Sequence, residues 1–139
     1  MIKWHIKYTD YDGVQREEDF YFGLNKAEII EMNFSKDGGY EKYLRRIVDE
    51  QDARSLLAEF KHLICISYGV KSDDGKRFVK SKELTDQFLQ TEAYAELFTE
   101  LANNTDSITR FVNGILPDEV RKKAEEASRN GSVLPMATA

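Results

Sequence analysis

The chain has 139 residues, of which 41% are hydrophobic and 12% aromatic, and its formal net charge is −5. This size and apolar content suit one folded domain and exclude an intrinsically disordered chain. The acidic balance argues against nucleic-acid binding, which usually needs a basic face. A lone cysteine, Cys65, excludes an internal disulfide and fits a reducing compartment. Residues 1–5 lack the apolar core of a signal peptide, and no apolar run approaches the ~20 residues that span a bilayer.

Residues 1–23 predict a β-hairpin. Residues 2–8 alternate between apolar and polar side chains, which is typical of a half-buried strand, and residues 14–22 supply its partner. A two-residue turn would set Ile6 opposite Asp19. A three-residue turn at residues 11–13, with Gly13 in the left-handed conformation, places apolar residues opposite apolar residues. It also places basic residues of the first strand opposite acidic residues of the second. We therefore predict the longer turn, with these facing pairs: Ile2–Phe22, Trp4–Phe20, His5–Asp19 and Lys7–Glu17.

The rest of the chain predicts six or seven short helices. Asn25 caps a helix over 26–34, with Glu28 in the capping-box position. An apolar stripe at helical spacing runs through 40–48, and Asp52 caps a further helix that stops near Gly69. The helix starts that follow are Ser81, Thr91, Thr105 or Asp106, and Pro117 in the first turn of a last helix that reaches about Ser128.

Two segments have no helical or strand periodicity. Residues 71–80 are a polar, basic loop with a turn at residues 73–75. Residues 129–139 are expected to be a disordered tail, which leaves residues 1–128 as a single domain. The fold class is therefore α+β and mostly α-helical, with an N-terminal hairpin followed by a compact helical bundle.

The sequence offers no catalytic, cofactor-binding or metal-binding constellation. His5 and His62 have no metal-ligand spacing with Cys65 or with each other. Cys65 lies in an apolar run, which predicts a buried structural thiol rather than a nucleophile. The acidic turns at residues 10–13 and 73–75 lack the ligand spacing of a calcium loop.

Function is therefore expected on a protein-binding surface, and each candidate has a structural alternative. The aromatic face of the hairpin either packs on its own helices or contacts another chain, because open strand edges can pair. The loop at 71–80 either meets an acidic partner or is only solvated. The aromatic residues Tyr40, Tyr43, Tyr94 and Phe98 have helical spacing and are expected first in the core. The predicted partner-binding residues are Trp4, Phe20, Phe22, Lys76, Arg77, Phe78 and Lys80.

Several segments of residues 6–118 resemble the tail assembly chaperones of long-tailed bacteriophages and prophages. They are DGKRFVKS at residues 74–81, FLQTEAY at 88–94, ELF at 96–98, FYFGLNKAE at 20–28 and FVNGILP at 111–117. The resemblance implies a non-enzymatic chaperone that binds the tape-measure protein, keeps it soluble and helps to recruit tail-tube protein. It also implies action in the cytoplasm of the bacterial host, absence from the mature virion, and in many phages a longer frameshifted form.

Two alternatives remain at this point. A structural tail component retained in the virion would be rich in β-sheet, whereas this pattern is mostly helical. A small regulatory protein that binds nucleic acid is disfavoured by the acidic charge. We expect a non-enzymatic chaperone, with homo-oligomerisation possible and with no nucleic-acid, membrane or cofactor partner.

Overall fold

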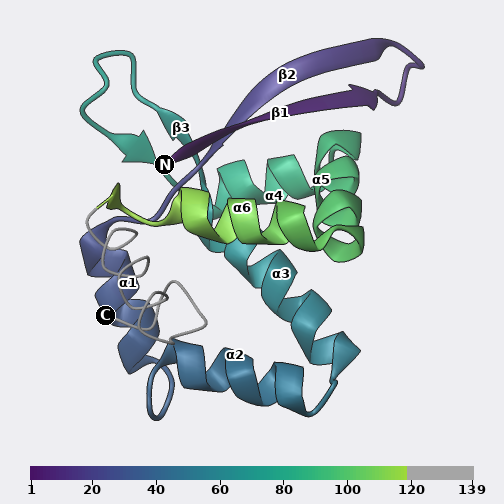
Figure 1. The fold of residues 1–139 in the computed structure, drawn as a ribbon. Coiled ribbons are helices and arrows are strands. Elements are labelled where there is room, and N and C mark those ends of the chain that lie inside the picture. Colours follow the sequence, from purple (N-terminus) through teal and green to yellow (C-terminus); the bar gives the residue numbers. More distant parts are fainter. Residues whose placement is uncertain (119–139) are drawn as a thin grey trace.

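The computed structural model describes residues 1–118, which form two β-hairpins over a set of six helices (Figure 1). This is the predicted α+β, mostly α-helical class. The predicted tail at 129–139 and most of the last predicted helix lie outside the described residues. In chain order the elements are β1 (Ile2–Thr9), β2 (Gln15–Phe22), α1 (Lys26–Phe34), α2 (Tyr40–Asp49), α3 (Ala53–Ser67), β3 (Tyr68–Lys71), β4 (Phe78–Val79), α4 (Lys82–Leu89), α5 (Glu92–Asn103) and α6 (Thr105–Ile115).

The first hairpin has the register that the sequence predicts. Trp4 lies opposite Phe20, and His5 lies opposite Asp19. The amide of Asp10 donates to the carbonyl of Val14 at 2.9 Å, which closes a three-residue turn, and Gly13 adopts a φ of 80°. Glycine reaches that left-handed conformation without the steric cost that a Cβ brings.

The loop predicted for 71–80 is partly wrong, because it contains a second hairpin. The helix that was expected to reach Gly69 ends at Ser67, and β3 and β4 flank the predicted turn to complete an antiparallel sheet of order β1-β2-β3-β4. Gly69 pairs with Tyr21 on β2. The polar composition of this segment predicts a loop, but β3 forms a strand because the edge of β2 supplies hydrogen-bond partners for its backbone. These partners lie far from β3 in the sequence, so a local pattern does not reveal them.

The core lies where the sheet meets α3 to α6. Trp4, Phe22 and Phe111 are almost fully buried, and the Phe22 and Phe111 ring centroids are 5.2 Å apart. Phe88 on α4 stacks on Tyr68 with a centroid distance of 4.5 Å. The hairpin is therefore held by a shared aromatic cluster, which an isolated hairpin in water would lack.

Helices α1, α3, α4 and α5 begin at the caps that the sequence predicts. The Asn25 side chain accepts from the amide of Glu28 at 2.8 Å, and the Glu28 carboxylate accepts from the amide of Asn25 at 3.0 Å. The side chains of Asp52, Ser81 and Thr91 each accept one bond from a backbone amide in the first turn of α3, α4 and α5. The helix α6 begins at Thr105, one of the two predicted starts, and the side chain of Asn104 caps it.

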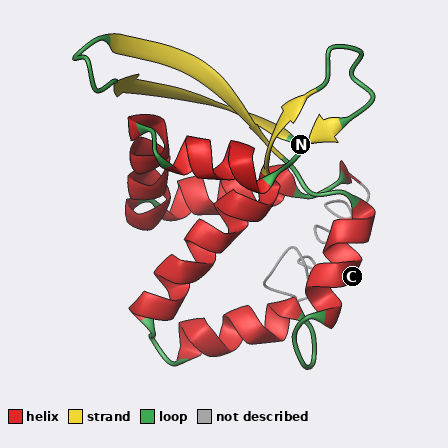
Figure 2. Cartoon of the chain, turned by 180° about the vertical axis from the view of Figure 1, so that it is seen from behind, coloured by secondary structure: helices red, strands yellow, loops and turns green. Residues whose placement is uncertain are grey.

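The helices divide into two regions. Helices α4, α5 and α6 underlie the sheet, whereas α1 and α2 lie at the opposite end of the molecule and α3 connects the two regions (Figures 1 and 2). The β3–β4 hairpin and the distal half of the β1–β2 hairpin diverge from each other, so they share only the base of the sheet.

Candidate partner-binding surfaces

A groove lies between α1 and α2, and we call it the α1–α2 groove. It has a volume of about 680 Å³. Its residues come from α1, from the connection at residues 36–39 and from α2: Ile30, Asn33, Phe34, Lys36, Asp37, Gly38, Gly39, Tyr40, Glu41, Lys42 and Arg45. Gly38 and Gly39 both have positive φ, which turns the chain sharply between the two helices.

The α1–α2 groove exposes unusual apolar surface. Phe34 is 86% exposed and Ile30 is 56% exposed, and they are four positions apart on α1. The residues that α1 buries are Ile29 and Met32, so its apolar side chains point in two directions. A stable helix needs only one buried face, and the second face of α1, which residues 1–118 leave exposed, is suited to contact another molecule.

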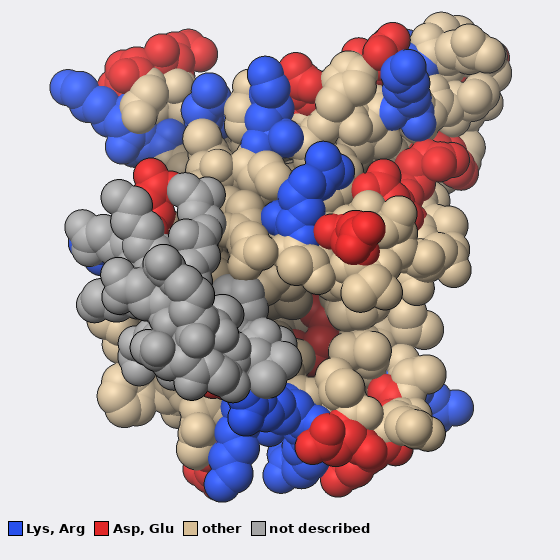
Figure 3. All heavy atoms as spheres, in the orientation of Figure 1, with Lys and Arg blue, Asp and Glu red and all other residues tan. Residues whose placement is uncertain are grey.

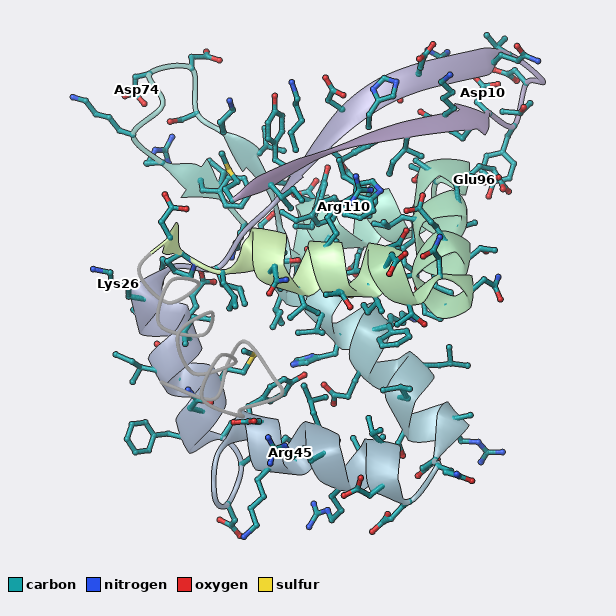
Figure 4. All side chains as sticks on the ribbon, in the orientation of Figure 1. Asp10, Lys26, Arg45, Asp74, Glu96 and Arg110 are labelled. Atoms are coloured by element: carbon teal, nitrogen blue, oxygen red, sulfur yellow. The ribbon has the colours of Figure 1, made fainter. Side chains whose placement is uncertain are left out.

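The charged residues of the groove are mixed, with a small basic excess. Basic and acidic side chains lie next to each other over α2, at the lower end of the molecule (Figure 3). Arg45 lies on α2 near the connection to α1 (Figure 4), and its guanidinium is 2.8 Å from the carboxylate of Glu41. Lys36 places its ammonium 4.2 Å from the centre of the Tyr43 ring, a cation–π contact.

The wall of the groove is fixed by a buried polar contact. Tyr40 is 1% exposed and donates its hydroxyl proton to the carboxyl group of Glu59 on α3, which is 8% exposed. Burial, together with this hydrogen bond, raises the pKa of Tyr40 far above its ordinary value. Tyr40 therefore remains a neutral donor, and the contact holds α2 against α3.

The second surface is the β3–β4 hairpin, which carries four of the predicted partner-binding residues. Lys76 and Arg77 are exposed at the turn, as predicted for a solvated or partner-facing loop. Phe78 is half-buried and lies against Gly69, where a Cβ would come within 2.8 Å of the Phe78 ring. Only a glycine at position 69 allows the ring to approach the backbone so closely.

Lys80 makes structural contacts instead of facing solvent. Its ammonium donates to the carbonyl of Gly23 at 2.7 Å and to the carboxylate of Glu28 at 2.8 Å. These bonds tie the second hairpin to the start of α1. Any partner that engages Lys80 would have to compete with both of them.

The three hairpin aromatics predicted to bind partners belong to the core cluster. Trp4 is 3% exposed and Phe22 is fully buried, while Phe20 is half-buried and packs on Phe88 with a ring-centroid distance of 5.2 Å. A partner could contact Trp4 or Phe22 only after the hairpin moved. Among the expected core aromatics, Tyr40 is buried, and Tyr43, Tyr94 and Phe98 are partly buried against the core.

The exposed face of the hairpin carries a histidine between two acids. The ring nitrogens of His5 lie 2.7 Å from Asp19 and 2.8 Å from Glu17. Hydrogen bonds to Glu17 and Asp19 raise the pKa of His5 above its ordinary value. On the inner face, Tyr8 donates to Glu18, and this bond raises the pKa of Tyr8 to about 12.

Among the residues that the structure describes, no catalytic arrangement is found around Cys65. Its side chain is partly buried, in place of the full burial that was expected, and His62 is exposed. Burial raises the pKa of the Cys65 thiol, which keeps it protonated and weakly nucleophilic. Within residues 1–118 no group of three His, Cys, Asp or Glu side chains is arranged to hold a metal ion.

Sequence reasoning missed Ile30 and Phe34. The signal was available, since they recur at i and i+4 on a different face of α1 from the buried Ile29 and Met32. The capping pattern by itself predicts a helix over residues 26–34 and does not indicate which of its faces is exposed. None of the helices in the described part of the chain is both long and apolar enough to cross a membrane.

Fold and surfaces together define a small, mostly helical protein whose exposed features suit contacts with other proteins. The chain belongs to the phage tail assembly chaperone family, whose model matches residues 1–138. Such chaperones are generally non-enzymatic and interact with tail proteins during assembly. No curated protein and no solved structure is significantly similar to the chain.

Proposed function

We propose that this protein binds the tape-measure protein during tail morphogenesis, keeps it soluble and helps to recruit tail-tube subunits. The observation that carries the proposal is the match to the tail assembly chaperone family across nearly the whole chain. On this proposal the protein acts in the cytoplasm of the bacterial host and is absent from the finished virion. It works as a binding protein, without catalysis.

The α1–α2 groove is the surface that we assign to the tape-measure protein. A long helical partner presents apolar residues on one face, and such a helix binds by laying that face into a groove with apolar anchors. Phe34 and Ile30 provide two anchors one helical turn apart. The basic residues at the rim, Lys36, Lys42 and Arg45, favour a partner helix with acidic flanks.

The exposed turn of the β3–β4 hairpin is a second proposed contact. Lys76 and Arg77 are free to meet an acidic partner, and Phe78 adds an aromatic edge beside them. Of the seven residues predicted from sequence, only Lys76 and Arg77 are exposed, whereas Phe78, like Phe20 and Lys80, is partly buried and Trp4 and Phe22 are buried. Tail-tube recruitment would then use a surface distinct from the α1–α2 groove.

The proposal is tested by co-expression with the tape-measure protein encoded nearby, followed by size-exclusion chromatography with light scattering. A co-eluting complex is expected, with tape-measure protein that is insoluble when expressed alone. Failure to form a complex, together with recovery of this protein from purified virions, would instead indicate a structural tail component.

Matched variants locate the surface. Replacing Ile30 and Phe34 together with serine should weaken the complex at least tenfold, because burying one large apolar side chain contributes roughly 1.5–3 kcal/mol. Val48→Ser is the control, since Val48 is 55% exposed but does not line the groove. Equal losses from both changes would count against the α1–α2 groove as the tape-measure site.

A further inference from the structure

The β1–β2 hairpin has two unpaired edges within the described residues. In an antiparallel pair, every second residue of a strand directs its backbone amide and carbonyl toward the partner strand. The hydrogen bond between Asp10 and Val14 shows which residues of β1 these are, and they include Trp4 and Ile6. On β1, the amides and carbonyls of Lys3, His5, Lys7 and Thr9 consequently point away from β2. On β2, the same rule turns Gln15, Glu17 and Asp19 outward, beyond the point where β3 pairs with Tyr21.

The two edges carry opposite charge. The outward residues of β1 at positions 3, 5 and 7 are Lys, His and Lys, and those of β2 at positions 15, 17 and 19 are Gln, Glu and Asp. All six side chains are exposed. A sheet edge accepts another strand through its backbone, and cross-strand charges decide which strand it accepts.

There is room for an added strand at both edges. Next to β1, a cleft of about 580 Å³ runs between residues 4–7 and the outer side of α5. At the other edge, the distal part of β2 diverges from the β3–β4 hairpin, which leaves residues 15–19 uncovered by that hairpin (Figures 1 and 2).

We infer that this chain associates with itself head to tail, with the β1 edge of one copy pairing antiparallel with the distal β2 edge of the next. The register places Lys3 opposite Asp19 of the next copy, His5 opposite Glu17 and Lys7 opposite Gln15. This extends the antiparallel sheet without disturbing the bonds inside the hairpin. The inference goes beyond the proposed function and does not depend on the tape-measure site.

Charge selects this arrangement over the symmetric ones. Pairing β1 with β1 of a second copy would set Lys3 opposite Lys7 and His5 opposite His5. Pairing β2 with β2 would set Glu17 against acidic residues of the other copy. Both create like-charge contacts, which destabilise a strand pair. Because the complementary contact uses different edges on each copy, it leaves a free edge at each end and permits open-ended growth.

The test uses variants that block one edge each. His5→Pro removes an outward-facing amide of β1, and Glu17→Pro does the same on β2, while the backbone bonds between β1 and β2 remain. Both variants also remove the side-chain contact between His5 and Glu17. Thr9→Pro is the control, because Thr9 lies on the same edge but outside the paired residues 3–7. Sedimentation equilibrium gives the mass of each protein, and thermal melting confirms that each one is folded.

The wild-type mass should rise with protein concentration without stopping at a dimer, and Thr9→Pro should behave like the wild type. Each blocked variant alone should be monomeric, whereas an equimolar mixture should form a one-to-one dimer, because one variant retains its β2 edge and the other its β1 edge. Raising the salt concentration from about 0.05 M to 0.5 M should weaken wild-type association roughly tenfold by screening.

Three results would overturn the inference: a wild-type protein that is monomeric at all concentrations, an assembly that stops at a dimer, or a mixture of the blocked variants that stays monomeric. If a proline variant does not fold, Lys3→Glu combined with Lys7→Glu provides a second test. This variant makes both edges acidic and should abolish self-association, and persistent association would contradict the proposed pairing.

Discussion

The contact between Tyr40 and Glu59 gives the sharpest test of how the α1–α2 groove is held in place. Replacing Tyr40 with phenylalanine keeps the ring and its packing but removes the hydroxyl donor. Both residues are buried, at 1% and 8% exposure, so water cannot readily replace the lost bond. Losing a hydrogen bond to a buried carboxyl group costs about 1–3 kcal/mol.

We expect a value near the middle of this range. Burial, together with the charge of Glu59 and a hydrogen bond to it, raises the pKa of Tyr43. The Tyr43 hydroxyl therefore also interacts with Glu59 and can partly compensate for the lost bond. A loss of ~2 kcal/mol corresponds to a fall in melting temperature of ~6 °C for a chain of this size. Differential scanning calorimetry at neutral pH measures both quantities directly.

Two further variants make the result decisive. Tyr94→Phe is the control, because the Tyr94 hydroxyl donates no hydrogen bond to any other residue of the described part, and it should change the melting temperature by less than ~2 °C. The double change Tyr40→Phe with Glu59→Met removes both polar partners and should recover most of the stability. The reasoning is refuted if Tyr40→Phe is as stable as the wild type, or if the double variant is less stable than the single one.

Three other predictions concern different parts of the fold. Gly114→Ala should destabilise the protein by about 1–3 kcal/mol, despite the higher helix propensity of alanine, because its Cβ would clash with the side chain of Ile2; calorimetry showing a gain would contradict this packing. Lys80→Met should lower the free energy of unfolding, measured by chemical denaturation, by about 1–2 kcal/mol because it removes the bonds to Gly23 and Glu28. Replacing the exposed Lys76 by alanine should not change this free energy measurably. The pKa of His5 is raised, so the contacts of the protonated ring with Glu17 and Asp19 stabilise the fold fully below the ordinary pKa, and this stabilisation is lost as the pH rises through the raised pKa. His5→Gln should therefore lower the melting temperature more at pH 5.5 than at pH 8.5. An equal decrease at the two pH values would argue against a charged contact.

Local chemistry in the sequence determined the first hairpin and the starts of the helices. The register of β1 and β2 follows from matching apolar and charged positions on the two sides of the turn at Gly13. A shift of the register by one residue would move every side chain of one strand to the opposite face of the sheet. Capping is equally local, because Asn25 and Glu28 satisfy each other's backbone amides within one turn of helix. Each of these features depends on residues that lie within about 20 positions of each other, so the local sequence is enough to predict them.

Only the tertiary structure decided which aromatic and basic residues are available to a partner. Trp4 and Phe22 look like surface candidates on a bare hairpin, but α6 brings Phe111 against both of them. Lys80 resembles Lys76 in sequence, yet a contact with Glu28, 52 positions away, turns it into a structural tie. Phe34 is exposed because no other element of residues 1–118 packs on its face of α1. Burial depends on which elements meet in space, and residues far apart in the chain decide that, so local pattern identified the elements but could not identify the surface.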